Sequence, residues 1–261
     1  MLSALAAATA LPAPAAAGTR RSALVIGNAE YLDAPLRNPV NDARLVASTL
    51  ERLGFEVMRL ENASLAGMID GLRRWIVGSR DAGVRAFYFA GHGTQYQGRN
   101  FLVPVDLAIE IEPEIERGAL LLTDVVEALS GQQHGVNFVI IDACRTDPKS
   151  LLRPSGRRTR GIESLLRPGF AALPAPRGTV VAYSTSPGAL ALDGAGTNNS
   201  VFTRALASEM LEPGLPVESL FKRVRLSVMR ATRNAQVPWE SSSLVGDFCF
   251  RPNARGRCVP D

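Results

Sequence analysis

The sequence predicts an α/β fold: a three-layer sandwich in which helices cover both faces of a central, mainly parallel, six-stranded sheet. Two observations lead to this prediction. Short apolar runs that suit strands alternate along the chain with segments of helical periodicity, as expected for βαβ crossovers between parallel strands. The chain also has 261 residues, 46% of them hydrophobic, which is enough to bury a sheet of this size.

The predicted strands are mostly apolar runs of six or seven residues. In chain order they are SALVIG at 22–27, 55–60, RAFYFAG at 85–91, NFVIIDA at 137–143, GTVVAYS at 178–184, and a last strand at 244–250. The predicted helices lie between and after them, at 39–53, 64–78, 123–129, 200–212 and 217–232. In the first helix Val40, Ala43, Val46, Ala47 and Leu50 share one face, and Gly54 is expected to end it.

The two ends of the chain differ in composition from the middle. Residues 20–250 are expected to form one domain, with a leader at 1–19 and a tail at 251–261. The leader is nearly all Ala, Leu and Pro and ends in AAAG, which resembles the end of a signal peptide, although no Lys or Arg precedes its apolar part. It predicts either export to the periplasm or beyond, or a disordered leader on a cytoplasmic protein. No other apolar stretch reaches 18 residues, so no membrane span is expected.

The charged residues and the cysteines narrow the function classes. The net charge of +4 reflects a basic cluster at 153–167 without interleaved aromatic residues, so nucleic-acid binding is not expected. Cys249 and Cys258 form either a disulfide in an exported protein or two unrelated thiols, and Cys144 is unpaired in both cases. Two histidines and scattered cysteines do not suit a zinc site.

Reactive residue types follow neighbouring predicted strands. In parallel sheets, catalytic groups lie beyond the carboxyl ends of the strands. Gly-His-Gly at 91–93 ends one strand, and Asp-Ala-Cys-Arg at 142–145 ends another. A cysteine nucleophile needs a base and oxyanion donors. We therefore expect His92 to be the base and proton donor for Cys144, and the N–H groups of Gly93 and Cys144 to form an oxyanion hole.

Each of these motifs has a plainer interpretation when it is taken alone. A cysteine after a strand is more often a small buried hydrophobic residue, and Gly-His-Gly is more often a loop. Their occurrence together at two neighbouring strand ends favours catalysis. His134 precedes a strand and is expected in a surface turn.

His92 lies 52 residues before Cys144, a spacing that is typical of caspases. With this pair, the chain resembles the caspase-like cysteine peptidases of the C14 family, in particular their bacterial metacaspase and paracaspase branch. The matching motifs are SALVIGN at 22–28, Tyr31, LRNPVNDA at 36–43, FAGHG at 89–93, FLVPVD at 101–106, DACR at 142–145, VAYSTSPG at 181–188 and parts of 237–248.

The resemblance spans about residues 20–250 and implies a caspase-hemoglobinase-like fold. It implies a large-subunit-like part at about 20–150, an arginine-rich loop at 151–176 and a small-subunit-like part at 177–250. The implied chemistry is peptide hydrolysis through an acyl-enzyme on Cys144, without an organic cofactor. Calcium activates many metacaspases, but no ligand cluster in this sequence demands it.

Asp142 departs from the caspase pattern, since caspases proper place Gln at this position. A carboxylate beside the nucleophile would repel an acidic side chain and attract Arg or Lys. The resemblance implies that Asp142 and Asp42 line an acidic primary pocket. Asp193 resembles a third acidic wall, in a register that the motif does not fix. The alternative for Asp42 is a helix residue that bonds to a nearby backbone N–H.

The expected partners are protein or peptide substrates with basic residues, bound by a monomer or a homodimer. The loop at 151–176 is either a site of self-cleavage or a solvated flexible loop. A catalytically silent caspase-like scaffold is the main rival, and the intact His92 and Cys144 argue against it. Nucleotide-binding proteins and serine hydrolases are excluded, because no G-x-G-x-x-G opens a helix and no G-x-S-x-G occurs.

Overall fold

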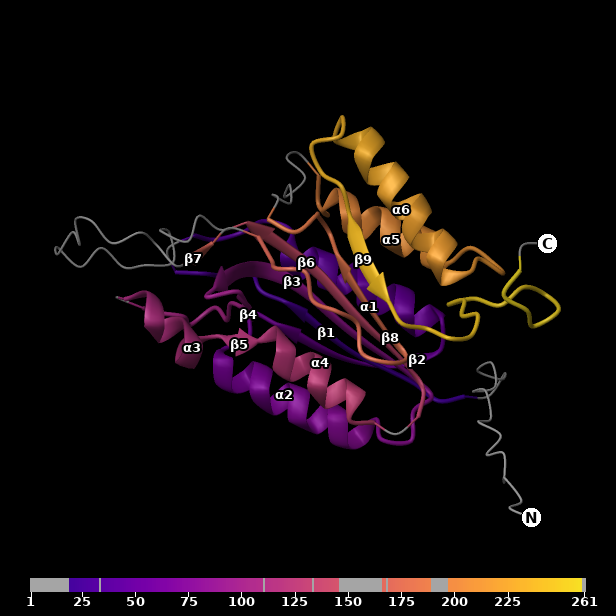
Figure 1. Cartoon of the computed structure of the whole chain (residues 1–261), viewed down its shortest axis with the longest axis horizontal. Coiled ribbons are helices and arrows are strands. Elements are labelled where there is room, and N and C mark those ends of the chain that lie inside the picture. The colour runs from indigo at the N-terminus through magenta and orange to yellow at the C-terminus, as the bar shows by residue number, and fades with distance from the viewer. Residues whose placement is uncertain are drawn as a thin grey trace, which may run out of the picture.

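The computed structural model describes residues 19–32, 34–109, 111–132, 134–145, 166–167, 169–188 and 197–259. Asp193, residues 1–18 of the leader, and residues 151–165 and 168 of the arginine-rich loop lie outside these residues. In the described part, one sheet has the strand order β2-β1-β3-β6-β8-β9, which confirms the predicted six-stranded, mainly parallel sheet (Figure 1).

Five parallel strands form the body of the sheet, and β9 (Trp239–Ser242) pairs with β8 in the antiparallel direction. The inner strands are buried on both faces and read as apolar runs, whereas β2, at the edge, is largely half-buried. All five parallel strands lie where the sequence predicts them. They are β1 (Arg21–Gly27), β2 (Phe55–Glu61), β3 (Val84–Tyr96), β6 (Val136–Arg145) and β8 (Thr179–Tyr183).

Helices cover both faces of this sheet (Figure 1). One face packs against α1 (Pro39–Arg52), α5 (Val201–Met210) and α6 (Val217–Ala231), and the other packs against α2 (Leu65–Gly78) and α4 (Leu122–Ser130). Side chains of β3 alternate between the two layers, with Tyr88 in the first and Phe87 and Phe89 in the second. Among the described residues, no helix has both the length and the apolar character that crossing a bilayer requires.

The predicted last strand at 244–250 is wrong. The edge strand is β9, and the later segment runs without strand pairing into the core beside α6. Phe248 and Phe250 place their rings 4.8 and 4.9 Å from the ring of Phe138. The alternation of aromatic residues that suggested a strand arises from burial in this core.

Two cysteines flank the end of this segment. Cys249 and Cys258 are joined in a disulfide, so the pairing is the alternative that the structure supports. The bond closes a short loop after the last buried aromatic residue, Phe250. Arg21 Nη1 donates to the Phe250 carbonyl (2.6 Å), which fastens the carboxyl-terminal segment to the start of β1.

The strand β3 changes partners along its length. Its first part is parallel to β1 and β6, and from Gly93 onward it pairs in the antiparallel direction with β4 (Arg99–Leu102). Gln97 and Gly98, with φ of 49° and 78°, form the two-residue turn, as in a type I′ hairpin. Two-residue strands, β5 (Leu120–Leu121) and β7 (Leu166–Arg167), extend this hairpin.

Between β4 and β5 lie a 3₁₀ turn, η1 (Glu112–Glu114), and a single helical turn, α3 (Ile115–Gly118). Their apolar side chains pack with Tyr96 and Phe101 of the hairpin in a small core of their own. The hairpin of β3 and β4, with η1, α3 and β5, therefore extends the sheet beyond the carboxyl ends of the parallel strands.

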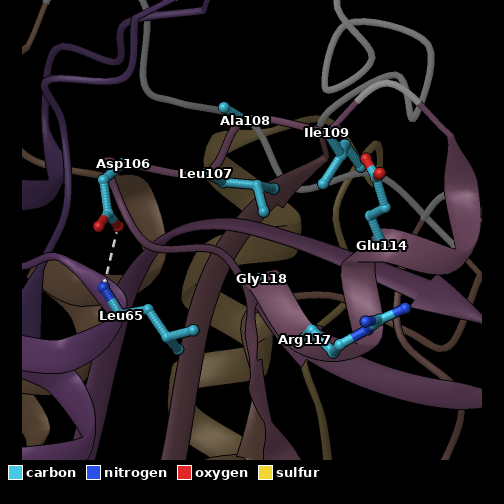
Figure 2. Close-up of a pocket in the computed structure, with 8 residues that line it drawn as sticks. All are labelled: Leu65, Asp106, Leu107, Ala108, Ile109, Glu114, Arg117 and Gly118. Atoms are coloured by element: carbon cyan, nitrogen blue, oxygen red, sulfur yellow. Dashed lines mark hydrogen bonds between the residues drawn. The ribbon is translucent and has the colours of Figure 1, made fainter.

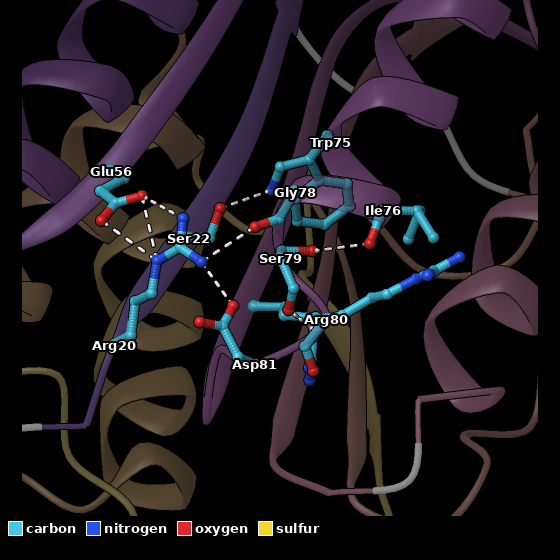
Figure 3. Close-up of polar contacts among 10 residues, drawn as sticks. Arg20, Ser22, Glu56, Trp75, Ile76, Gly78, Ser79, Arg80 and Asp81 are labelled. Atoms are coloured by element: carbon cyan, nitrogen blue, oxygen red, sulfur yellow. Dashed lines mark hydrogen bonds and ion pairs between the residues drawn. The ribbon is translucent and has the colours of Figure 1, made fainter.

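Arg20 joins several elements at the amino-terminal ends of the parallel strands. Arg20 donates through Nε to Glu56 (3.1 Å) and through Nη1 to the carbonyl of Gly78 (3.0 Å), and it also pairs with Asp81 (Figure 3). In the same region the indole N–H of Trp75 donates to the hydroxyl of Ser22 (2.9 Å). These contacts join the start of β1 to the start of β2 and to the end of α2.

Candidate active site

The register of β3 and β6 brings the predicted site residues to one edge of the sheet. His92 is the Cα partner of Cys144, and Ala90 is the partner of Asp142. These pairs lie at the carboxyl ends of both strands, where β3 turns away into its hairpin. The backbone positions of the predicted base and nucleophile are therefore adjacent.

The imidazole of His92 is buried, with 3% of the residue exposed. Its Nε2 lies 2.6 Å from the carbonyl oxygen of Ala34. Because a carbonyl can only accept, Nε2 carries the hydrogen, and Nδ1 holds the lone pair of the neutral ring. Burial lowers the pKa of His92, and the Ala34 carbonyl partly opposes this effect. The site therefore favours the neutral imidazole, the form that can accept a proton.

Neither glycine beside His92 has room for a side chain. Gly91 has φ of +155°, and a Cβ at this position would come 2.5 Å from the hydroxyl oxygen of Tyr31. A Cβ on Gly93 would collide with the ring of Phe170. The N–H of Val103 donates to the His92 carbonyl (3.0 Å), which makes the next pair, Gly93 with Leu102, a non-hydrogen-bonded one. The Gly93 N–H thus points away from β4.

Asp142 lies under the amino terminus of α5, with 3% of the residue exposed. Its carboxylate accepts hydrogen bonds from the hydroxyls of Ser200 and Thr203, the latter at 2.7 Å. Ser184 and Tyr88 contribute further hydroxyl bonds. Burial raises the pKa of Asp142, and these hydroxyls oppose the rise because they stabilise the ionised form.

Asp42 reaches the same place from the first turn of α1. Its Oδ1 accepts from the Asn199 side-chain amide (2.9 Å) and from the backbone N–H of Ser200 (2.9 Å). Ser200 thus bonds to both carboxylates, through its N–H to Asp42 and through its hydroxyl to Asp142. We call these residues, with Thr203, the acidic cluster.

The alternative role of Asp42, bonding to a backbone N–H, is present, but that N–H belongs to α5 and not to its own helix. Two helix amino termini, those of α1 and α5, meet at the cluster, and their dipoles favour negative charge there. The sequence prediction missed Ser200 and Thr203. The available signal was Ser200 as the N-cap of a predicted helix, a residue that bonds to the Thr203 N–H (2.9 Å).

The profile described as "Caspase domain" (Peptidase C14) matches residues 20–249 of this chain. The chain belongs to the caspase domain family. This family comprises cysteine peptidases of clan CD, which agrees with the type of site found at the strand ends.

Two curated relatives are similar to this caspase domain. Human "Mucosa-associated lymphoid tissue lymphoma translocation protein 1" and its mouse homolog are each 27% identical over 194 residues, or 73% of this chain. The match covers 22% of the human and 21% of the mouse protein, so this chain corresponds to about a fifth of each. The crystal structure of caspase-1 from Spodoptera frugiperda matches with a TM-score of 0.64 and 19% identity, over 90% of this chain and 92% of that one. That likeness shows the fold.

The caspase domain also carries a pocket of about 380 Å³ on the α2 side of its hairpin (Figure 2). Its lining comprises Leu65, Asp106, Leu107, Ala108, Ile109, Glu114, Arg117 and Gly118, and it includes none of the predicted site residues. Asp106 accepts from the Leu65 N–H (2.9 Å) and so caps the start of α2. Within the ranges that the structure describes, no group of three His, Cys, Asp or Glu side chains could hold a metal ion.

Proposed function

We propose that this caspase domain is an endopeptidase that hydrolyses peptide bonds after Arg or Lys. The thiolate of Cys144 attacks the substrate carbonyl carbon, and His92 takes up the thiol proton. The C–N bond then breaks, the amine leaves with the proton from His92, and water hydrolyses the thioester to release the acid and the thiol. The N–H groups of Gly93 and Cys144 would stabilise the oxyanion.

The adjacency of His92 and Cys144 across β3 and β6 is the observation that carries this proposal. The bond from His92 Nε2 to the Ala34 carbonyl supports it, because that bond puts the hydrogen on Nε2 and the lone pair that can accept a proton on Nδ1. The low exposure of the imidazole supports it as well, since burial lowers the pKa of His92 and favours the neutral base.

The acidic cluster supports the preference for a basic residue. Asp142 stands two residues before Cys144 in the same strand, and Ser200 links it to Asp42. A guanidinium presents five N–H donors and suits carboxylates that already accept bonds from neutral donors. A substrate Arg could replace the Asn199 amide, which now donates to Asp42.

A set of peptides that differ only in the residue before the scissile bond tests the proposal. We expect the wild type to cleave Arg and Lys peptides in preference to Leu and Asp peptides. Cys144→Ala should reduce kcat/KM on the Arg peptide by at least about 1,000-fold. Equal, negligible turnover by the wild type and Cys144→Ala would favour the alternative, a catalytically silent caspase-like scaffold. A preference for Asp would contradict the acidic pocket and leave the Cys–His pair standing.

Self-cleavage within 153–167 is a further part of the proposal, supported by the arginines of that segment. Mass spectrometry of purified wild type and Cys144→Ala over a long incubation checks it. We expect cuts after arginine in the wild type alone. A wild-type chain that stays intact while it turns over an Arg peptide would show that processing is not required.

We also propose that the domain acts in the periplasm or outside the cell. The disulfide between Cys249 and Cys258 supports this compartment, because disulfides persist in oxidising environments. Cell fractionation with thiol labelling checks the compartment. Two additional labelled cysteines in protein taken directly from cells would indicate a reducing compartment instead.

A further inference from the structure

The loop that follows β1 is pinned at its start by two asparagines. The side chain of Asn28, fully buried, donates to the Val103 carbonyl (3.2 Å) and accepts from the Ala63 N–H (2.9 Å). The Asn62 side chain accepts from the N–H of Ala29 (2.9 Å). The loop is therefore fastened to the segments that follow β2 and β4 before it reaches the neighbourhood of His92.

Tyr31, the next large side chain of this loop, lies against His92. Its hydroxyl accepts from the His92 backbone N–H (2.8 Å) and donates to the Val103 carbonyl (3.1 Å). The phenol and imidazole centroids are 4.2 Å apart, with an angle of 44° between the rings. Only 7% of Tyr31 is exposed, and the space beside its hydroxyl exists because residue 91 is glycine.

These contacts fix two different degrees of freedom of His92. The hydroxyl of Tyr31 holds the backbone at the point where β3 changes partners. Its ring limits the tilt of the imidazole, and the Ala34 carbonyl then selects which ring nitrogen carries the hydrogen. Tyr31 and Ala34 lie three positions apart in the chain, so we expect displacement of the phenol to disturb the Nε2 bond.

We propose that Tyr31 is a positioning residue, whose phenol holds His92 with Nε2–H on the Ala34 carbonyl and so keeps the lone pair of the neutral ring on Nδ1. The effect on turnover rests on the proposed peptidase function. The effect on the imidazole itself does not, because it concerns only the tautomer and orientation of one ring.

Tyr31→Phe is the variant that tests this role, because it keeps the ring and removes only the hydroxyl. The His92 N–H and the Val103 carbonyl then each lose a partner. We expect kcat on an Arg peptide to fall about 10–100-fold, as for a small displacement of a catalytic group. KM should change less than about threefold, since the Tyr31 hydroxyl bonds to the His92 N–H and to the Val103 carbonyl.

Tyr96→Phe is the matched control. Tyr96 is also buried in β3, with 3% exposed, but its hydroxyl bonds to the Gln97 side chain and not to His92. We expect this variant to keep the kcat of the wild type. If both variants lose kcat equally, the loss reflects general weakening of β3, and the positioning role is contradicted.

Nitrogen NMR of the imidazoles reads the same effect without any substrate. The chain has two histidines, and the exposed His134 supplies an internal reference. We expect one wild-type ring to be in the Nε2–H form when neutral, and Tyr31→Phe to mix its tautomers while His134 is unchanged. A wild-type His92 in the Nδ1–H form would overturn the proposal even if the variant did not fold.

The two readouts separate the possible failures. A changed His92 spectrum in a chain without peptidase activity would refute the proposed function and retain the role of Tyr31. A peptidase whose His92 spectrum and kcat are the same in wild type and Tyr31→Phe would refute the role of Tyr31 alone.

Discussion

At the starts of the strands, arginines bind carbonyl oxygens and exposed carboxylates, whereas at the strand ends carboxylates are buried among hydroxyls. Arg85, with 1% exposed, donates to the carbonyls of Ser79 (2.8 Å), Arg80 (2.8 Å) and His134 (2.9 Å). Asp142, with 3% exposed, accepts from Ser200 and Thr203 instead. The first arrangement ties loops together, and the second keeps a costly carboxylate beside the predicted nucleophile.

The comparison teaches how to separate structural from chemical residues in this domain. Burial of a carboxylate against neutral donors raises its pKa and works against folding at neutral pH. Groups retained under such a cost are candidates for function. Changes at the strand starts should therefore reduce stability and leave turnover unchanged. Changes at the strand ends should mainly reduce turnover.

The largest effect is expected from Phe250→Ala at the strand starts. Phe250 is 1% exposed and packs near the rings of Phe138 and Phe248. Its truncation should lower the free energy of unfolding by about 3–5 kcal/mol, measured by urea denaturation. Val245→Ala, at a residue 62% exposed, should change it by less than about 0.5 kcal/mol. A fully folded Phe250→Ala protein with reduced kcat would break the comparison.

Asp142→Asn comes next and acts at the strand ends. Loss of the charge should lower kcat/KM on the Arg peptide by about 100-fold and leave a Leu peptide nearly unaffected. Asp124→Asn, on the exposed side of α4, is the control and should act like the wild type. An equal loss on both peptides would show that Asp142 supports the strand end and does not read the substrate.

The same variant sharpens the comparison through pH. Because burial raises the pKa of Asp142, its contribution to stability is present below the ordinary value of 3.8 and is lost as pH rises through the higher folded value. Between pH 4 and pH 7 the wild type should therefore lose stability relative to Asp142→Asn. Parallel stability curves, measured by urea denaturation at each pH, would contradict a raised pKa.

The disulfide should have a smaller effect, again at the strand starts. A loop closed by Cys249 and Cys258, nine residues apart, is expected to contribute about 2–3 kcal/mol through the unfolded chain. Thermal denaturation with and without reductant measures it. The Cys249→Ser, Cys258→Ser double variant should have the Tm of the reduced wild type, and reductant should not change it. A large loss of kcat in that variant would link this end to the chemistry.

The smallest effect is expected from Arg20→Gln. Arg20 is 39% exposed, and its carboxylate partners are more exposed still. Solvent and salt screen such pairs. The variant should lower Tm slightly at low ionic strength, and the difference should disappear in 1 M NaCl. A salt-independent drop would instead assign the effect to the bond with the Gly78 carbonyl.

The sequence predicted the five parallel strands and the five long helices because each buried element repeats its own apolar period. The exception is instructive. β9, with the sequence WESS, lies half-buried at the edge and has little apolar signal, whereas the buried aromatic residues of 248–250 imitate a strand. The pattern of apolar residues in a short segment indicates which residues are buried. It indicates strand pairing only where the buried segment also belongs to the sheet.

For the site, the rule that groups gather at strand ends was sufficient to place His92, Cys144 and Asp142 together. The contacts that orient them were not predictable in this way. The Ala34 carbonyl is a backbone group that every residue has, and so it leaves no trace in the sequence. Ser200 was visible as a helix start, but its bonds to two carboxylates depend on how α5 lies over the sheet.

Ser200 lies 158 residues after Asp42 along the chain, yet it bonds to it directly. During synthesis on the ribosome, the emerging polypeptide holds Asp42, His92 and Cys144 long before α5 has left the exit tunnel. Segments made early must wait for later ones before the acidic cluster can close. A growing chain thus cannot complete this cluster until most of the protein has been translated.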